Sequence, residues 1–318
     1  MSQVVEAIAP QRFGTGFRRL LASAWASDLG DGVALAAGPL LVVSQTREPF
    51  LIALATLLQR LPWVVLGLYA GVIADRHDRR LIVVGANTAR VAVLAVLSVM
   101  IVTDTVSVVS VLVALTLLGT AEVFVDTTTS TLVPMLVDRG DLGVANSRLM
   151  FGRITINRLG GPAIGALLFA VGMAIPFVVQ AVCVAFAALI IRSIAVDRPP
   201  PRAEVPSVRR EIAEGLRWVW GHPAIRTLTI TIFAFNITFG ATYGIMVLYA
   251  AERLGLDEVG YGFLVTTSAV GAVVGTIVYG RLEAWLGRSG IMRIGLIIET
   301  GTHLVLAVTT VPAVAFST

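Results

Sequence analysis

Apolar runs of about twenty residues recur along the whole chain, and they constrain its fold more than any other feature. A helix of this length crosses the hydrocarbon core of a bilayer, which is roughly 30 Å thick. The mean hydropathy is +0.86 and only 14% of the residues are charged, whereas roughly a quarter are charged in soluble proteins. The sequence therefore predicts an all-α polytopic membrane protein.

Nine membrane-spanning helices are predicted from these runs. They cover residues 20–44, 50–74, 81–102, 106–132, 142–171, 173–195, 224–250, 259–281 and 291–313. The first six form an N-terminal six-helix bundle over residues 1–195, and the last three form a partial C-terminal bundle over 224–318. Residues 196–223 form the cytoplasmic linker between them.

The basic residues alternate between the two sides of the predicted membrane. All 24 are arginines, and 18 of them lie at the N-terminus and in every second loop after it. The opposite loops hold only Arg47 and Arg253. Because cytoplasmic loops collect arginine and lysine, this asymmetry predicts a multi-pass protein of the cytoplasmic (inner) membrane with its N-terminus in the cytoplasm. The pI of 9.8 then reflects topology, and we expect no nucleic-acid partner.

The linker contains a second kind of helix. Its prolines, in "DRPPPRAEVPS", stop the sixth span. The segment that follows places Ile212, Leu216 and Trp220 on one face of a helix. Such an amphipathic helix either lies on the inner membrane surface or forms a solvated connection between the two bundles.

A weak internal repeat links the two parts of the chain. A shift of 209 residues places "YGRLEAWLGRSG" on "YAGVIADRHDRR", with Gly280 on Gly71 and Arg288 on Arg79. Spans seven to nine then repeat spans one to three in order and orientation, as internal duplications in transporters do. Two full sets of six would need about 418 residues on this repeat. We therefore expect the chain to be truncated by roughly a hundred residues.

The loop after the second span has an unusual concentration of charge. In "GVIADRHDRR", Asp75 ends a helix at the membrane boundary, where Arg76, Arg79 and Arg80 can pair with it and with anionic lipid. Gly71, one turn earlier, would let another helix approach closely. The loop acts either as a gating clasp that forms and breaks, or as an orientation signal.

These residues resemble a known family. "GVIADRHDRR" is similar to the signature loop of the major facilitator superfamily, with Asp78 where that family usually has glycine. The chain further resembles its drug and siderophore exporter branch, which includes macrolide efflux proteins and the enterobactin exporter. The stretches that carry this resemblance are "SDLGDGVALAAGPLLV", "LLGTAEVFVDTTTSTLVPMLV", "ANSRLMFGRITINRLGGPAIGALL" and "EGLRWVWGHP". It implies two six-helix halves around a central cavity, with the clasp holding them together when the cytoplasmic side is shut.

Several ionisable residues lie inside the predicted spans, where each costs at least ~2.5–3.5 kcal/mol unless it has a partner or a function. Asp28 and Asp31 share one face of the first span, ~13 and ~18 Å below the membrane surface. Glu122 and Asp126 share a face of the fourth span. Arg153 enters the fifth span at a similar depth.

Two hypotheses account for these charges. In the first, Asp31 and Glu122 take up and release protons, with Asp28 as a further candidate and Arg153 tuning them. In the second, static pairs join Arg153 to Glu122 and Arg158 to Asp126. No acid near Arg60 or Arg90 in the sequence identifies a partner for either.

Two weaker motifs complete the candidate site. "GGPAIG" (Gly160, Gly161, Pro162, Gly165) resembles the helix-5 motif of antiporters in the superfamily, with plain helix packing as the alternative. Asn236, Thr238 and Tyr243 on the seventh span are candidates for lining a substrate cavity.

No catalytic constellation and no phosphate-binding loop is present in the sequence, so we expect no enzyme activity. A single cysteine and three scattered histidines predict neither a disulfide nor a metal site. The sequence favours a monomeric exporter of amphiphilic small molecules in the lipid bilayer, a drug or siderophore, with no cofactor and the proton gradient as its energy source. The alternatives are a nonfunctional truncated transporter and a membrane binding protein that does not transport.

Overall fold

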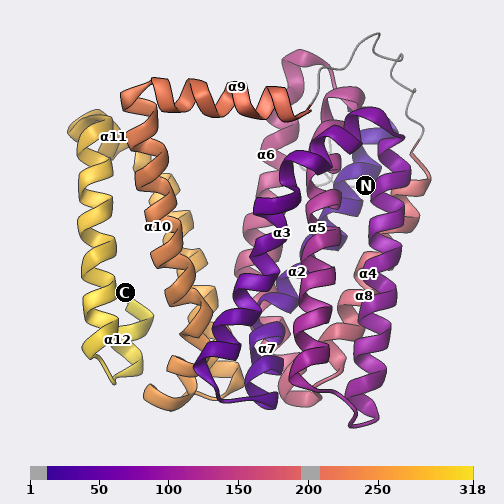
Figure 1. Ribbon diagram of the computed structural model, residues 1–318. Coiled ribbons are helices and arrows are strands. Elements are labelled where there is room, and N and C mark those ends of the chain that lie inside the picture. Colours follow the sequence, from indigo (N-terminus) through magenta and orange to yellow (C-terminus); the bar gives the residue numbers. More distant parts are fainter. Residues whose placement is uncertain (1–12, 195–207, 318) are drawn as a thin grey trace, which may run out of the picture.

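The computed structural model describes residues 13–194 and 208–317, and within these ranges the regular elements are helices. Five crossings of the N-terminal half are single helices: α2 (Gly14–Gln45), α3 (Pro49–Arg76), α4 (Arg79–Val102), α5 (Val108–Leu136) and α8 (Ile175–Arg192). The remaining crossing is composite. After the short η2 (Arg139–Asp141), it runs through α6 (Leu142–Gly152), the π-helical η3 (Arg153–Gly160) and α7 (Gly161–Val171). Figure 1 shows these helices as one upright bundle.

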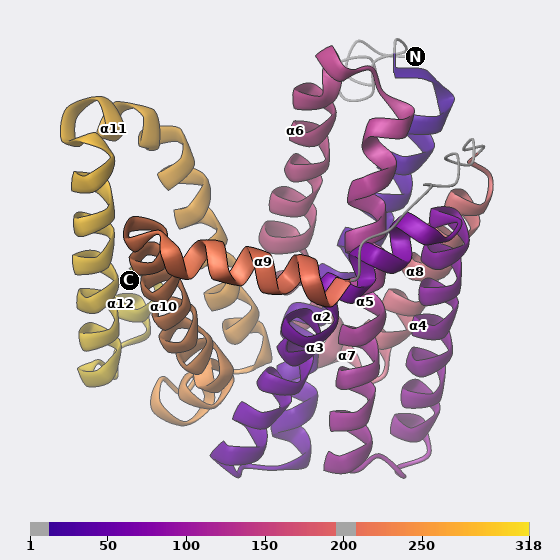
Figure 2. The same cartoon turned by 45° about the horizontal axis from the view of Figure 1, so that its top comes forward.

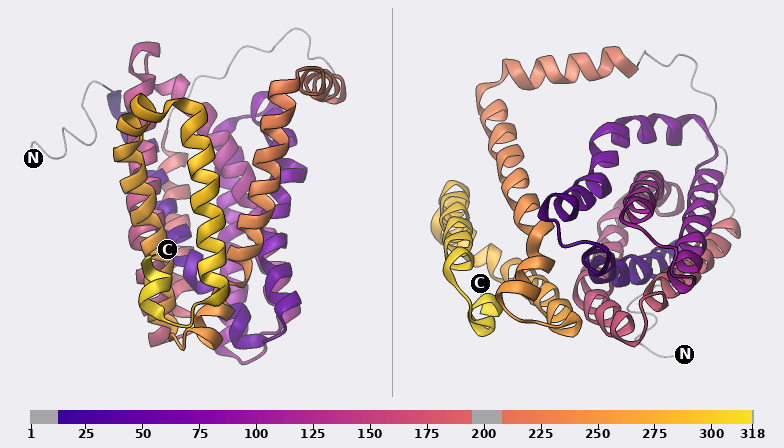
Figure 3. Two further views of the ribbon diagram at one scale, coloured as in Figure 1. Left: turned by 90° about the vertical axis from the view of Figure 1, so that its left-hand side faces the viewer. Right: turned by 60° about the horizontal axis from the view of Figure 1, so that its bottom comes forward.

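The C-terminal half begins with α9 (Val208–Gly221), which lies across the ends of the upright helices (Figures 1 and 2). The helix α10 (Pro223–Leu248) continues into the π-helical η4 (Tyr249–Arg253). The long α11 (Glu258–Val308) contains two helices that join at Gly287, whose φ of +66° favours glycine. The short α12 (Pro312–Ser317) follows. Figure 3 shows this half standing to one side of the N-terminal bundle.

The predicted polytopic fold is confirmed. Among the described residues, eight helices are long and apolar enough to cross a bilayer. The predicted span without a counterpart among these eight is the eighth, 259–281, which lies in the first part of α11. The predicted end of the last span, at 313, is wrong because α11 ends at Val308 and Pro312 starts another helix. Proline disfavours the helical conformation of the residue before it. The predicted end of the sixth span, residue 195, lies outside the described residues.

Local sequence signals explain where several helices begin. Ser107 and Ser110 form a reciprocal capping box at the start of α5. The carboxylate of Asp78 accepts hydrogen bonds from the backbone N–H groups of Arg80 and Leu81, and so caps α4. Proline occupies the first turn of α3 and of α10, where its missing N–H has no helical partner to lose.

Two apolar clusters fill the N-terminal half and leave a polar layer between them. One surrounds Phe17 and Leu20, near the start of α2, and includes Leu132 of α5. The other surrounds Leu41 at the far end of α2 and includes Leu97 of α4. The two acidic residues of α2, Asp28 and Asp31, lie in the stretch between these clusters. The fold therefore holds them inside the membrane-spanning part of the bundle, away from both ends.

The two halves touch at the end opposite α9. There Val247 and Tyr261 of the C-terminal half share an apolar cluster with Leu41 and Ile52 of the N-terminal half. Toward α9, in contrast, α10 carries exposed apolar side chains such as Phe233. Figure 1 shows α10 leaning away from α3 in this direction.

Candidate functional site

The best-connected carboxylate in the polar layer is that of Asp31, on α2. It forms an ion pair with Arg90 of α4, whose Nη2 donates to Oδ1. Gln180 Nε2 of α8 donates to the same oxygen at 3.2 Å, and Ser27 Oγ donates to Oδ2 at 3.1 Å. Donors from three helices therefore converge on one carboxylate, which in its ionised form only accepts hydrogen bonds.

Arg90 is one of the two arginines, with Arg60, for which the sequence identified no partner. Its side chain is 2% exposed, against 20% for Asp31. Its Nη1 also donates to Asn87 Oδ1 at 3.2 Å and to Ser27 Oγ at 3.3 Å. Arg90 Nε and Gln180 Oε1 are buried, and no described residue forms a hydrogen bond with either atom. Since buried polar atoms are nearly always bonded, this centre is under-satisfied and has capacity for another arrangement.

A second ionic centre lies around Arg153, the first residue of η3. Its Nη2 donates to Asp126 Oδ2 of α5 at 2.8 Å, and its Nε lies 3.9 Å from Asp28 Oδ1 of α2. Asn157 Nδ2, one turn further along η3, donates to the backbone carbonyl of Asp28 at 3.1 Å. The Arg153 side chain is 48% exposed, so this centre opens toward the space beside the bundle.

Glu122 lies between the two centres. It is close enough to Asp31, Arg90, Asp126 and Arg60 to interact with each electrostatically. Among the residues that the structure describes, no arginine lies within ion-pair distance of its carboxylate. Glu122 is thus a carboxylate within reach of Arg90 that the guanidinium does not engage in this conformation.

The structure brings the predicted residues Asp28, Asp31, Glu122 and Arg153 into one region of the bundle. The static pairs named in the second hypothesis differ from the observed ones. Arg153 pairs with Asp126 instead of Glu122, and no described carboxylate pairs with Arg158. The roles of these residues in proton coupling stay predictions.

The sequence did hold a signal for Arg90. Counted from Arg80 at the membrane boundary, Arg90 lies ~15 Å deep at ~1.5 Å per residue. That depth is between the ~13 and ~18 Å expected for Asp28 and Asp31. Matching charges by depth across spans, instead of by distance along the chain, would have proposed the pair.

The "GGPAIG" motif forms the crossing of α7 with α2. A Cβ at Gly161 would collide with the backbone of Gly32, and one at Gly165 would collide with the carbonyl of Val33. Pro162, buried in the first turn of α7, follows directly on η3. A Cβ at Gly160 would meet only its own helix, at Thr155 O. Close packing therefore accounts for Gly161 and Gly165, and any further part of the motif in antiport stays a prediction.

The three residues predicted to line a substrate cavity lie in different surroundings. Asn236 Nδ2 donates to the Ile232 carbonyl at 2.8 Å and Thr238 Oγ1 to the Phe235 carbonyl at 2.9 Å, both on their own helix. Tyr243 is half-buried, lies near Ser268 of α11, and is within electrostatic reach of Arg60 and Arg158. Of the three, Tyr243 lies closest to the charged groups of the N-terminal half.

The loop between α3 and α4 is fastened to its own half. Arg79 Nη2 donates to Asp75 Oδ1 at 2.9 Å, and its Nη1 donates to Met135 Sδ of α5 at 2.8 Å. Arg80 Nη1 donates to the Ile194 carbonyl at 3.3 Å. Arg76 is exposed, and a Cβ at Gly71 would meet no atom within 4 Å. The close helix approach predicted at Gly71 is therefore absent from this conformation, as far as the described residues show.

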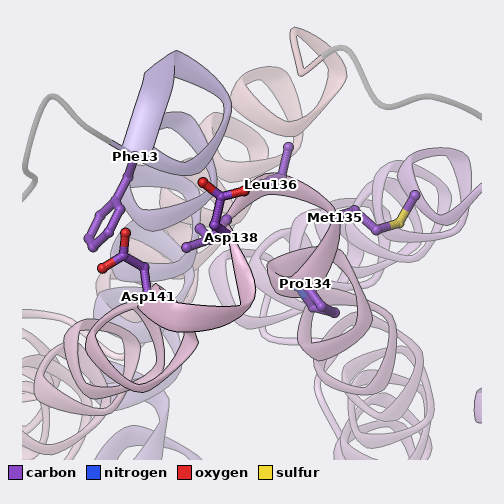
Figure 4. A pocket seen from close by; sticks show the side chains of 7 residues that line it. Phe13, Pro134, Met135, Leu136, Asp138 and Asp141 are labelled. Atoms are coloured by element: carbon purple, nitrogen blue, oxygen red, sulfur yellow. The ribbon is translucent and has the colours of Figure 1, made fainter.

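A small pocket of about 270 Å³ lies beside this loop, between the start of α2 and the end of α5. Figure 4 shows Phe13, Asp138 and Asp141 on one side of it and Met135 on the other. The lining includes Phe13, a member of the apolar cluster around Phe17, and none of the residues of the two ionic centres. Among the described residues, no group of histidine, cysteine, aspartate and glutamate side chains could hold a metal ion.

Comparisons with known proteins agree with this architecture. A family described as transmembrane secretion effector matches residues 5–318. Two curated relatives are uncharacterized MFS-type transporters of Mycobacterium bovis and Mycobacterium tuberculosis, each 36% identical over 134 residues. The match covers 41% of this chain and 30% of either relative, so the chain matches less than a third of their length.

Two solved structures share the fold at low sequence identity. A bacterial homolog of the human lysosomal transporter Spinster, inward-facing and unoccupied, is similar with a TM-score of 0.71 and 14% identity, over 96% of this chain and 71% of that one. A bacterial homologue of the iron transporter ferroportin, also inward-facing, has a TM-score of 0.63 and 14% identity, over 94% of this chain and 79% of that one.

Proposed function

Because the chain belongs to the transmembrane secretion effector family of the major facilitator superfamily, we propose that it is a secondary active exporter of amphiphilic small molecules, such as a drug or siderophore. Export is driven by protons that enter as the substrate leaves, and no cofactor takes part. The observation that carries this proposal is the buried Asp31–Arg90 pair beside Glu122, a carboxylate without an ion-pair partner among the described residues.

The proposed coupling step is an exchange of partners by Arg90. A proton that binds Asp31 cancels the negative charge that holds Arg90, and a buried guanidinium without an acceptor is strongly destabilised. Glu122 lies within electrostatic reach and can take over the guanidinium. Release of the proton from Asp31 restores the original pair. The two arrangements provide the pair of states that an alternating-access cycle requires.

The conformation of the two halves supports this cycle. They are in contact at the end opposite α9, and α10 exposes its apolar side chains toward α9. The arginine-rich loops lie at the α9 end, which we assign to the cytoplasm of a cell with the protein in its inner membrane. This conformation is then open inward, like those reported for the Spinster and ferroportin homologues.

The signature loop has a place in the same cycle. In this open conformation Asp75 and Arg79 pair with each other, and Gly71 faces open space. We propose that a helix of the C-terminal half reaches Gly71 when the cytoplasmic side closes. Arg76 and Arg80 then exchange with Arg79 as the partners of Asp75.

Proteoliposomes that contain the purified monomer test the proposal. Pyranine trapped inside them reports proton movement when a gradient of a dansyl-labelled amphiphile is imposed. We expect substrate-dependent proton flux that Asp31→Asn reduces to background. The matched control is Asp104→Asn, the same chemical change in the exposed turn between α4 and α5, where a φ of +54° suits asparagine equally well.

Two results would overturn the proposal. Unchanged proton flux in Asp31→Asn would remove this residue from coupling. Substrate binding without flux, in the parent protein and at every imposed pH difference, would identify a membrane binding protein that does not transport.

A further inference from the structure

Two arginines inside the spanning region stand apart from the ionic centres. Arg60 lies on α3 and Arg158 on η3, and both are exposed to the space around the bundle. No described residue forms an ion pair or side-chain hydrogen bond with either guanidinium. All the aspartates nearby are already engaged, Asp31 by Arg90 and Asp28 and Asp126 by Arg153.

Three close helix crossings bring these arginines to one place. At the first, a Cβ at Gly119 of α5 would lie 2.6 Å from Gln59 O, and Glu122, three residues further along α5, is within electrostatic reach of Arg60. At the second, a Cβ at Gly244 of α10 would lie 3.3 Å from Thr56 Oγ1, one turn of α3 before Arg60. Arg60 is thus held where α10 approaches α3, next to Tyr243.

The third crossing positions Arg158. A Cβ at Gly262 of α11 would lie 3.0 Å from Pro162 O, and Arg158 precedes Pro162 by one helical turn. Ser268 of the same helix lies near the Tyr243 hydroxyl, and its own hydroxyl donates to the Val265 carbonyl. Arg60 and Arg158 therefore both lie within electrostatic reach of the Tyr243 hydroxyl, at the boundary between the two halves.

An aromatic row leads away from this point along α10. The rings of Tyr243 and Phe239 stack with centroids 5.7 Å apart, and those of Phe239 and Phe235 with centroids 6.0 Å apart. Residues four apart share a face of a helix, so the row continues the face of Tyr243 toward α9. An amphiphilic molecule could place its charged head group at the two arginines and its apolar body along this aromatic row.

We propose that Arg60 and Arg158 bind the anionic group of an amphiphilic substrate whose apolar body lies along Tyr243, Phe239 and Phe235. Guanidinium groups suit carboxylate, sulfonate and phosphate oxygens because they donate paired hydrogen bonds in a plane. Among the described carboxylates near these two guanidinium groups, only Glu122 is not already paired with an arginine. The site therefore keeps an excess positive charge that an anion neutralises. This inference rests on the proposed transport function and names its substrate class.

A matched pair of probes tests the inference with the full chain in nanodiscs of neutral lipid. The probes are 11-(dansylamino)undecanoic acid and its N-methyl amide, which differ in the presence of the negative charge. We expect the acid to bind at least about tenfold more tightly than the amide, from hydrogen bonds to charged groups. Equal affinity for the two probes would overturn the inference without any mutation.

Variants separate the head group from the body. Arg60→Gln with Arg158→Gln should make the two affinities equal, whereas Arg226→Gln, the same change at an exposed position near the start of α10, should keep the preference. Phe239→Ala should lower the affinity for both probes by a similar factor. A preference for the acid that survives the double arginine change would also overturn the inference.

The same probes distinguish this inference from the proposed function. Proton-coupled flux of the amide with no preference for the acid would leave the transport proposal standing and remove the anion site. Tight, arginine-dependent binding of the acid without proton flux would support the anion site and remove the transport proposal.

Discussion

The Asp31–Arg90 pair makes a quantitative prediction about stability. Each charge can be removed with little change in side-chain volume, through Asp31→Asn and Arg90→Met. Arg90→Met leaves Asp31 with Ser27 and Gln180 as its donors. Asp31→Asn leaves a guanidinium that is 2% exposed, with Ser27 and Asn87 as its acceptors. Removing one partner of a buried pair costs about 3–5 kcal/mol.

The double variant distinguishes a coupled pair from two independent polar residues. We expect each single change to lower the free energy of unfolding by about 3 kcal/mol, at the low end of that range because Asp31 is 20% exposed. With both charges gone, no unpaired charge remains. The double change should therefore cost about 3–4 kcal/mol, which corresponds to a coupling energy of about 2–3 kcal/mol.

Reversible unfolding in mixed micelles, titrated with sodium dodecyl sulfate and followed by circular dichroism, measures these free energies. The control cycle uses Asp75→Asn and Arg79→Met, which break a pair of good geometry at 2.9 Å whose carboxylate is 50% exposed. Its coupling should stay below about 1 kcal/mol. Additive effects of Asp31→Asn and Arg90→Met, within about 0.5 kcal/mol, would refute the view of this pair as one buried unit.

Three further predictions concern packing, capping and the linker helix. Gly161→Ala should destabilise the protein by about 1–3 kcal/mol because its Cβ meets the backbone of Gly32, whereas Gly67→Ala, which meets open space, should not lower the midpoint of unfolding. Asp78→Ala should cost about 1 kcal/mol through loss of the cap on α4, and Asp78→Gly only a few tenths, measured by the same titration. Trp220 is 62% exposed on the apolar face of α9, which we expect to lie in the membrane surface. In a variant with Trp220 as its single tryptophan, brominated lipid should therefore quench the fluorescence. Fluorescence that the brominated lipid leaves unchanged would show α9 to be a solvated connection.

Hydropathy predicted the spans well because each span must bury about twenty residues in lipid whatever its neighbours are. The ion pairs depend on more, namely the rotation of each helix about its axis and the identity of its neighbours. Arg90 illustrates the difference. Its depth is readable from the sequence, but its proximity to Asp31 depends on α4 and α2 both packing against α8. The unsuccessful pairing of Arg153 with Glu122 has the same origin, because Asp126 lies one turn away on the same face of α5.

The departure of the signature loop from its family pattern has a local explanation. Asp78 stands where the family usually has glycine, and its carboxylate caps the first turn of α4. Both residue types serve at a helix N-terminus, aspartate through its side chain and glycine through its backbone freedom. The loop can therefore keep its fold with either residue, and the substitution does not weaken the family assignment.

The fifth crossing connects the packing of the two halves to the charges. α7 is held on one side by Gly161 and Gly165 against α2, and on the other by Gly262 of α11. These contacts involve backbone atoms and leave no room for sliding, so a displacement of α11 must carry α7 with it or break the packing. The π-helical η3 adjoins α7 and departs from regular α-helical geometry, as such segments often do at functional sites. It carries both Arg153, paired with Asp126 and Asp28, and Arg158, which has no carboxylate partner among the described residues. Under the proposed transport cycle, a change in the contact between the halves would reach the segment that positions these two guanidiniums, and would link substrate, protons and conformation in one helix.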